Sequence, residues 1–272
     1  MPARIPAGTR SAYASGAPKE ARFATMESPI RLHWLDPRNP HQPFPPVHLA
    51  MRDPNGLLAI GGDLSTTRLL RAYRQGIFPW YNPDEPILWW CPDPRTVLLP
   101  SGLHVSRSLG KTVRRDDYAL SFDRAFGEVL AACGGERAKS RGTWLGPDMR
   151  AAYGDLFRKG HAHSVEVWRD GRLIGGLYGV AIGRVFFGES MFSHATDASK
   201  LALYWLCRQL ERWGFELIDC QVSSSHLLSL GAREVPREQF LRQLAQATNG
   251  GTLSPVWRFD DAPADPRHGP PP

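Results

Sequence analysis

The sequence contains few cysteines and no long apolar run. Its 272 residues include four cysteines, Cys91, Cys133, Cys207 and Cys220, and none forms the CxxC spacing typical of zinc sites or redox dithiols. No apolar stretch approaches the roughly 20 residues that cross a bilayer, and residues 1–25 lack the apolar centre of a secretory signal. We therefore expect a cytoplasmic protein that binds neither a metal nor a membrane.

Signature motifs of several enzyme classes are also absent. The chain has no P-loop, no dinucleotide-binding GxGxxG after a first strand, no HExxH and no GxSxG nucleophile elbow. These absences argue against ATP-driven, redox and serine-hydrolase chemistry.

The net charge leaves two possibilities open. The chain carries +6 and has a pI near 9.3, and basic side chains gain affinity for nucleic acids by releasing counterions from phosphates. Many basic proteins bind no nucleic acid, so the question is whether the charge is concentrated on one face.

The chain divides into a small N-terminal part, a larger C-terminal part and two tails. Asp63 or Ser65 can cap a helix that Gly76 ends, and the prolines of residues 76–95 favour a loop or short strands at a domain junction. We expect disordered tails at 1–28 and 259–272, where Pro and polar residues prevail, a small α/β domain at 29–96 and a catalytic domain at 97–258.

The C-terminal part reads as helices, a strand meander, a helix, a strand and more helices. Helices are predicted from the N-cap Ser106 through Arg115, over 123–133, 147–159, after Ser193, and over 225–230 and 236–247. An antiparallel meander of about three strands is predicted over 163–192, and a buried strand over 215–222. This order is an α+β pattern and the one that an acetyltransferase-like (GNAT) fold requires.

Four cations share one face of the helix that begins after Ser106. Their spacing is i, i+4, i+7 and i+8, and they are Arg107, Lys111, Arg114 and Arg115. Solvated basic faces are common, but no acid is interleaved here, so the stripe is a reasonable partner for a phosphate backbone.

Polar residues interrupt the strands that look most buried. In a regular strand Asp219 and Gln221 project from the same face, opposite Ile218 and Cys220, which favours a site that holds one substrate group over a purely structural hydrogen bond. Glu189, in GESMF, needs a partner, either an internal Arg or a positively charged substrate. The segment before the long helix, SHATDASK, has no glycine turn for the pyrophosphate of coenzyme A, so the acyl donor is a different one.

A set of motifs between residues 44 and 243 resembles the leucyl/phenylalanyl-tRNA–protein transferases. They are GLLAIGGDLS (56–65), GIFPWY (76–81), ILWWCPDPR (87–95), HSVEVW (163–168), GGLYGV (175–180), FFGESMFS (186–193), ASK (198–200) and IDCQ (218–221). The resemblance implies a small N-terminal domain, a GNAT-like catalytic domain and no cofactor. It also implies transfer of Leu or Phe, less well Met, from aminoacyl-tRNA to proteins that begin with Arg or Lys, which marks them for N-end-rule degradation.

The same resemblance implies roles for individual residues. Asp219 and Gln221 are its catalytic pair, and Trp80 stacks on the terminal adenine of the tRNA. The pocket for the donated side chain is formed by Trp144, Leu177, Phe186, Met191 and Ile218. Leu177 replaces a Met of some relatives, and this volume-conserving change should shift preference among Leu, Phe and Met. The basic stripe coincides with the region expected to hold the acceptor stem.

Chemistry limits what these residues need to do. An aminoacyl ester is already activated, and an α-amine with a pKa near 8 is partly neutral at pH 7, so a modest base or water suffices. An amide takes up no proton near neutrality, so we expect Gln221 to hold the amine by its carbonyl oxygen, and Asp219 to orient Gln221 or draw the proton away. Glu189 completes this network or pairs with the acceptor's cation.

Three other functions compete with this one. They are an acyl-coenzyme A N-acetyltransferase, a peptidoglycan-bridge aminoacyltransferase and an RNA-binding module without catalysis. The missing glycine turn argues against the N-acetyltransferase. The FPW, WW and GESMF segments argue against the peptidoglycan-bridge enzyme, and the pair of Asp219 and Gln221 argues against an RNA-binding module without catalysis. By default we expect a monomer.

Overall fold

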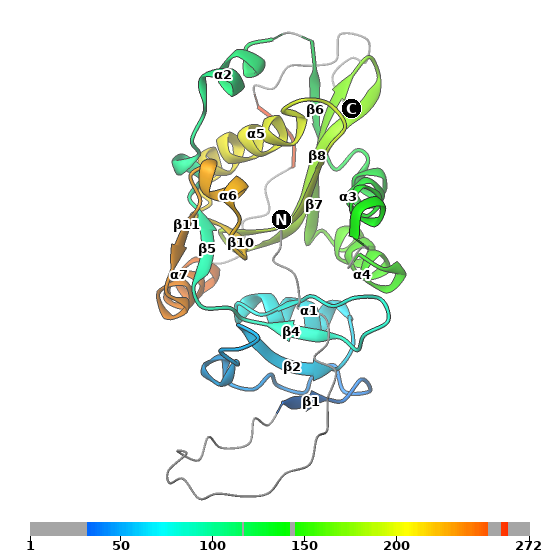
Figure 1. Cartoon of the computed structure of the whole chain (residues 1–272), viewed down its shortest axis with the longest axis vertical. Coiled ribbons are helices and arrows are strands. Elements are labelled where there is room, and N and C mark those ends of the chain that lie inside the picture. Colours follow the sequence, from blue (N-terminus) through cyan, green and yellow to red (C-terminus); the bar gives the residue numbers. More distant parts are fainter. Residues whose placement is uncertain (1–31, 116, 142–144, 250–256, 261–272) are drawn as a thin grey trace, which may run out of the picture.

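The computed structural model describes residues 32–115, 117–141, 145–249 and 257–260, which form two β-sheets with helices around them (Figure 1). The first sheet has the strand order β1-β2-β4-β3, and the second has the order β11-β5-β10-β9-β8-β7-β6. Residues 91–94 carry the chain from one sheet to the other. The predicted α+β class, with a small N-terminal part before a larger C-terminal part, is confirmed, while the acetyltransferase-like fold and the exact domain limits stay predictions.

The first sheet is short and carries one helix. Its elements are β1 (His33–Leu35), η1 (Val47–Leu49), β2 (Leu57–Gly61), α1 (Thr66–Arg74), β3 (Phe78–Pro79) and β4 (Leu88–Trp90). Ser65 caps α1, because its hydroxyl accepts a hydrogen bond from the backbone N–H of Arg68. Gly76 has a φ of +71° just after the helix, a conformation that glycine adopts without strain.

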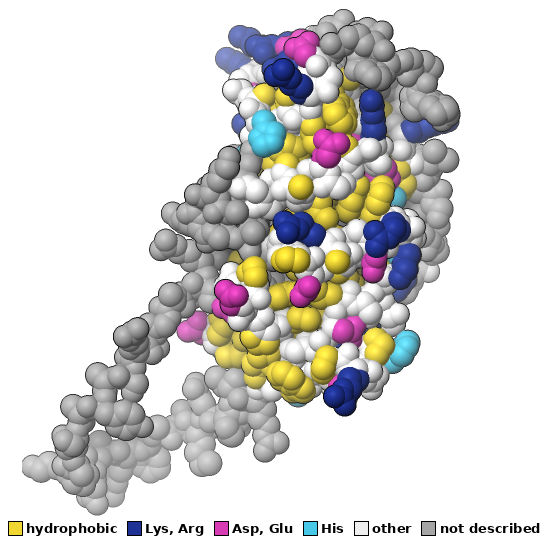
Figure 2. Space-filling model, turned by 90° about the vertical axis from the view of Figure 1, so that its right-hand side faces the viewer, with side chains coloured by type: hydrophobic (Ala, Val, Ile, Leu, Met, Phe, Trp, Pro, Cys, Tyr) yellow, Lys and Arg dark blue, Asp and Glu magenta, His cyan; other side chains and the backbone are white. Residues whose placement is uncertain are grey.

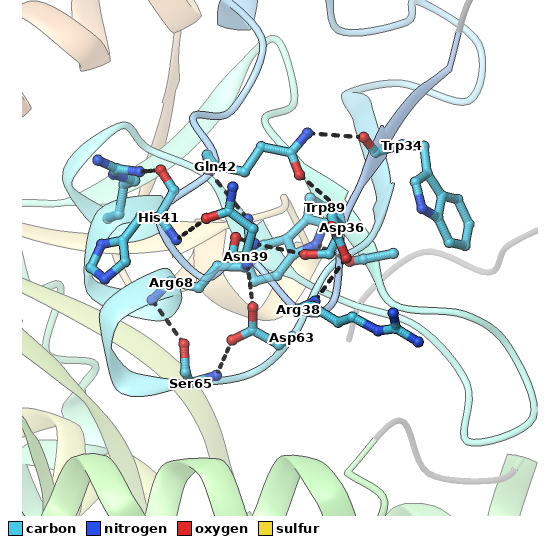
Figure 3. A network of polar contacts seen from close by, with 12 residues as sticks. Trp34, Asp36, Arg38, Asn39, His41, Gln42, Asp63, Ser65, Arg68 and Trp89 are labelled. Atoms are coloured by element: carbon cyan, nitrogen blue, oxygen red, sulfur yellow. Dashed lines mark hydrogen bonds and ion pairs between the residues drawn. The ribbon is translucent and has the colours of Figure 1, made fainter.

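Arg68 fastens the loop after β1 to the start of α1 (Figure 3). Its guanidinium is fully buried, pairs with Asp63 at 2.8 Å and donates to the backbone carbonyls of Asp36, Asn39 and Gln42. A buried cation needs such partners, because burying an unpaired charge would lower the free energy of unfolding by roughly several kcal/mol. The network therefore holds the N-terminal sheet and α1 as one unit.

The second sheet contains the predicted meander at its centre. Its strands are β5 (Arg95–Leu98), β6 (Ala119–Phe122), β7 (Ala162–Arg169), β8 (Arg172–Ile182), β9 (Val185–Ser193), β10 (Leu217–Gln221) and β11 (Arg233–Val235). Strands β7, β8 and β9 pair antiparallel, whereas β10 joins β9 in parallel and β5 antiparallel. The parallel pairing of β9 with β10 requires a crossover connection, and α5 forms it.

Helices cover both faces of this sheet. They are η2 (Pro100–Gly102), α2 (Arg107–Val113), α3 (Phe126–Arg141), α4 (Pro147–Arg158), α5 (Ala198–Arg212), α6 (Ser225–Ser229) and α7 (Arg237–Asn249). Figure 1 shows α5 on one face and α3 and α4 on the other, with α2 packed against α5 on the side away from the first sheet. Two buried apolar clusters fill the spaces between these layers.

Two predicted helices differ in extent from the observed ones. The helix expected over 123–133 begins only at Phe126 and continues to Arg141, because residues 119–122 form β6 and Asp123 has a left-handed φ of 58°. The helix expected through Arg115 ends at Val113, with Arg114 as its C-cap.

The far C-terminal segment packs on the sheet. Phe259 stacks on Phe122 with ring centroids 4.1 Å apart, and Asp260 accepts a hydrogen bond from Gln209 at 2.7 Å. Both residues fall in the stretch that the sequence predicts to be tail. The N-terminal extension 1–28 and residues 261–272 lie outside the described residues.

The surface is uneven in character. Figure 2 shows several Lys and Arg side chains at the end farthest from the N-terminal sheet, with others along this face, and apolar side chains exposed along most of its length. Among the residues that the structure describes, the most exposed large apolar side chain is that of Trp34 on β1, at 62%. Within the described part of the chain, no helix is both long and apolar enough to cross a membrane.

Candidate functional site

Strand β10 loses its regular alternation at its last residue. Asp219 pairs with Val97 and Gln221 with the adjacent Thr96, so Cys220 is an extra, bulged residue, and Gln221 has a φ of +60°. The prediction that Asp219 and Gln221 project from the same face of a regular strand is therefore wrong. Gln221 lines a pocket together with Ile218 and Cys220, whereas Asp219 is fully buried and does not line it.

Asp219 is held by a buried arginine. Arg95 Nε donates to Asp219 Oδ1 at 2.8 Å and Arg95 Nη2 to Oδ2 at 2.6 Å, and neither side chain is exposed to solvent. The guanidinium lies 4.8 Å from the ring centre of Phe78 and 4.7 Å from that of Phe240. Asp219 Oδ1 also accepts the backbone N–H of Gln221 at 2.9 Å. Asp219 thus fixes the backbone that carries Gln221.

Glu189 is the centre of a second polar network. Its Oε1 accepts from the Tyr73 hydroxyl at 2.8 Å and from Gln221 Nε2 at 3.0 Å, and its Oε2 accepts from the Tyr153 hydroxyl at 2.7 Å. The two tyrosine oxygens lie 2.7 Å apart. Because an ionised carboxylate can only accept, the amide nitrogen of Gln221 must face Glu189, which leaves the carbonyl oxygen of Gln221 for another partner.

The environment of Glu189 brings its titration to neutral pH. Burial raises the pKa of the Glu189 carboxyl to about 7, the hydrogen bonds from Tyr153 and Tyr73 lower it, and the charge of Asp219 raises it again. Burial also raises the pKa of both tyrosines well above the usual value, so they remain protonated donors. Small changes around Glu189 will therefore change its charge at pH 7.

The pocket is lined mainly by apolar side chains. It has a cavity volume of about 150 Å³, a size at which an apolar cavity accommodates a benzene ring. Side chains from β8, β9, β10 and α5 supply the apolar lining, which includes Leu177, Phe186, Met191, Leu203, Leu206 and Ile218. Trp80 lines the same pocket from the loop after β3.

The structure brings most of the predicted site residues together. Glu189, Gln221, Leu177, Phe186, Met191, Ile218 and Trp80 all line this pocket. Asp219 lies directly behind it, and Trp144 is outside the described residues. Over the described ranges, no group of three His, Cys, Asp or Glu side chains is arranged to hold a metal ion.

Three residues of these networks could not be assigned from the sequence. Tyr73 comes from α1 and Tyr153 from α4, while Arg95 begins β5. A buried acid signals that a partner exists, and an internal Arg was one of the partners expected for Glu189. The arginine is present, but it pairs with Asp219, and Glu189 uses two neutral hydroxyls.

The basic stripe lies on α2 and is solvent exposed. Arg107 and Lys111 belong to the helix, Arg114 caps it and Arg115 follows, and all four side chains are exposed. None of them forms an ion pair with an acid in the part of the chain described here. The helix packs on α5 through the buried Leu109 and Thr112, so the cations are free to meet a partner.

Comparison with known proteins identifies relatives over most of the chain. The family model of leucyl/phenylalanyl-tRNA protein transferase matches residues 97–245, and that of its N-terminal domain matches residues 62–93. A leucyl/phenylalanyl-tRNA–protein transferase of Thiobacillus denitrificans is 61% identical over 80% of this chain and 95% of the relative. The corresponding protein of Nitrosomonas europaea is 59% identical over 80% of this chain and 92% of the relative.

Solved structures are more distant. A GCN5-related N-acetyltransferase from Kribbella flavida has 13% identity and a TM-score of 0.34, and covers 61% of this chain and 59% of its own. The L-PGS structure from Bacillus licheniformis has 11% identity and a TM-score of 0.35, and covers 74% and 66%.

Proposed function

Because this chain belongs to the leucyl/phenylalanyl-tRNA–protein transferase family, we propose that it transfers Leu or Phe, and less well Met, from aminoacyl-tRNA to the α-amine of proteins that begin with Arg or Lys. The observation that carries this proposal is the carbonyl oxygen of Gln221, fixed by Glu189 beside an apolar side-chain pocket. The product then carries an N-end-rule degradation signal. We place the reaction in the cytoplasm and assign it to a monomer.

The donated side chain enters the apolar pocket. Leu177, Phe186, Met191 and Ile218 line it, and no charged group is needed to bind Leu, Phe or Met. Burying such a side chain contributes roughly 1.5–3 kcal/mol. The pocket discriminates by volume, so we expect modest preferences among the three.

The acceptor amine binds at Gln221. The Gln221 carbonyl oxygen accepts an N–H of the amine, which points the nitrogen lone pair at the ester carbon. Glu189 sets the orientation of the amide and supplies negative charge for the Arg or Lys side chain of the acceptor. Both functions require the ionised carboxylate.

Asp219 acts by positioning Gln221. Both of its oxygens are engaged by Arg95 and its side chain is fully buried, which leaves it no contact with a substrate in the pocket. Of the two roles considered for Asp219, orienting Gln221 fits this geometry, since Asp219 Oδ1 binds the Gln221 backbone N–H.

The tRNA reaches the pocket from its outer rim. Trp80 offers a ring for the terminal adenine, since unpaired bases stack on aromatic side chains. Arg107, Lys111, Arg114 and Arg115 offer exposed charge for the phosphates of the acceptor stem. These contacts position the ester without a nucleotide cofactor.

The deciding experiment is transfer of labelled Phe from Phe-tRNA to a peptide that begins with Arg. Transfer is expected with that peptide and not with its N-acetylated form. Acetyl-coenzyme A in place of Phe-tRNA should give no product, and acetylation would support an N-acetyltransferase instead. Binding of Phe-tRNA without transfer to any peptide would leave an RNA-binding module and overturn the proposal.

A further inference from the structure

Aminoacyl transfer moves one proton, and the residues discussed so far do not carry it. The amine nitrogen loses a proton when it becomes an amide nitrogen, and the ribose oxygen gains one when it leaves. Gln221 cannot take up a proton near neutrality. Asp219 is fully buried and paired with Arg95, so it cannot contact the amine. Glu189 already accepts three hydrogen bonds.

Three further titratable side chains line the pocket, Tyr178, Cys220 and His226, and of these only histidine ordinarily titrates near neutral pH. His226, on α6, borders the same cavity as Gln221 and Trp80. Its backbone carbonyl accepts from the Ser229 hydroxyl, but its imidazole makes no hydrogen bond or ring contact with the residues that the structure describes. We propose that His226 carries the proton from the attacking amine to the departing ribose oxygen. This inference rests on the proposed function of the site.

The surroundings of His226 suit a base that starts neutral. Partial burial lowers the pKa of the imidazole below its usual value, and the positive charge of Lys200 on α5 lowers it further. Glu189 on β9 is the acid that lines the same pocket, and its carboxylate accepts hydrogen bonds from Tyr73, Tyr153 and Gln221. At pH 7 the imidazole is therefore neutral and can accept a proton.

The steps balance without a further reactant. The amine attacks the ester carbon, a C–N bond forms and the carbonyl electron pair moves to oxygen. The nitrogen then carries an extra proton, which passes to the imidazole of His226. The intermediate collapses, the bond between carbon and the ribose oxygen breaks, and the imidazolium returns the proton to that oxygen. Nothing is oxidised, and His226 ends neutral, as in other acyl transfers that use one histidine as base and then acid.

The test compares His226→Gln with His161→Gln in single-turnover transfer of Phe to an Arg-starting peptide. His161 is a matched control, because it is also a partly buried histidine with a lowered pKa and it lies outside the pocket. His226→Gln is expected to lower the rate about 10²- to 10⁴-fold, the usual contribution of a positioned acid–base group, with little change in Phe-tRNA affinity. His161→Gln should transfer like the unmodified chain.

Two readouts separate proton transfer from a structural role. The slope of log rate against pH on the acidic side is expected to be smaller by one in His226→Gln, since one titration is removed. In His226→Ala, free imidazole should restore transfer in proportion to its neutral form. A near-normal rate in His226→Gln, or a lowered rate with an unchanged pH slope and no rescue, would overturn the inference. If the unmodified chain itself transfers no Phe, the proposed function fails instead.

Discussion

The side-chain nitrogen of Gln221 donates a hydrogen bond to Glu189 Oε1 over 3.0 Å, so the charge of Glu189 decides which way the amide of Gln221 faces. When Glu189 is ionised, only the NH2 group of the amide can face it. When Glu189 is protonated, its O–H can donate to the amide oxygen, and the orientation that suits an incoming amine is no longer enforced. The activity is therefore tied to a group whose pKa is about 7.

Replacement of Glu189 by Gln removes that control. We expect Glu189→Gln to lower kcat/KM for an Arg-starting peptide roughly 10²-fold, because a misoriented partner costs about that much. The slope of log rate against pH around pH 7 should fall by one, because one of the ionisations that control activity is removed. Glu216→Gln, an exposed acid paired with Arg184, is the control and should behave normally. A Glu189→Gln variant that keeps the normal pH profile would contradict this account.

Replacement of Tyr153 by Phe shifts the pH dependence. The Tyr153 hydroxyl lowers the pKa of Glu189, so its removal should raise that pKa and move the midpoint of activity to higher pH. Rate against pH measures the shift. Tyr118→Phe, whose hydroxyl donates to the Val113 carbonyl, should leave the midpoint in place. A shift toward lower pH in Tyr153→Phe would show that the sign is wrong.

The pair of Arg95 and Asp219 is expected to dominate stability near the site. Arg95→Met leaves a buried, unpaired carboxylate and should cost about 3–5 kcal/mol of the free energy of unfolding, measured with urea. Arg233→Met, at an exposed position on the neighbouring strand β11, should cost less than about 0.5 kcal/mol. Arg95→Met with Asp219→Leu should be more stable than Arg95→Met alone, and additive losses would refute the coupling.

Glu166 makes the stability of the fold depend on pH. The side chain is fully buried beside Ser121 and Ser164, and burial raises the pKa of its carboxyl from 4.5 to about 7. Because the folded pKa is the higher one, this group stabilises the fold below about pH 4.5, and that contribution is lost as the pH rises through 7. Glu166→Gln should flatten the fall of unfolding free energy over this range, and an unchanged slope would contradict the assignment.

The salt dependence of tRNA affinity tests whether the basic stripe contacts phosphates. Replacing Arg107, Lys111, Arg114 and Arg115 by Ala should weaken tRNA binding and reduce the slope of log K against log salt by roughly 3. Four exposed arginines elsewhere, Arg38, Arg52, Arg158 and Arg242, serve as a charge-matched control. An equal loss in both variants would show that only net charge matters.

Local patterns in the sequence account for most elements of the fold. Ser65 and Ser106 cap helices where their side chains predict it, and the turn at Asp170-Gly171 joins β7 to β8 within the predicted meander. From the sequence alone, Glu189, Asp219 and Gln221 can be recognised as polar residues within apolar strands. These features follow from neighbours within a few residues, where capping, turn geometry and strand alternation act.

Long-range packing decided the rest. Tyr73 and Glu189 are 116 residues apart, and Arg95 and Asp219 are 124 apart, yet each pair is in direct contact. Such contacts depend on how α1 packs against the second sheet and how β5 pairs with β10. The same pairing creates the bulge at Cys220 that separates Gln221 from Asp219, because the register between two strands is a property of both strands.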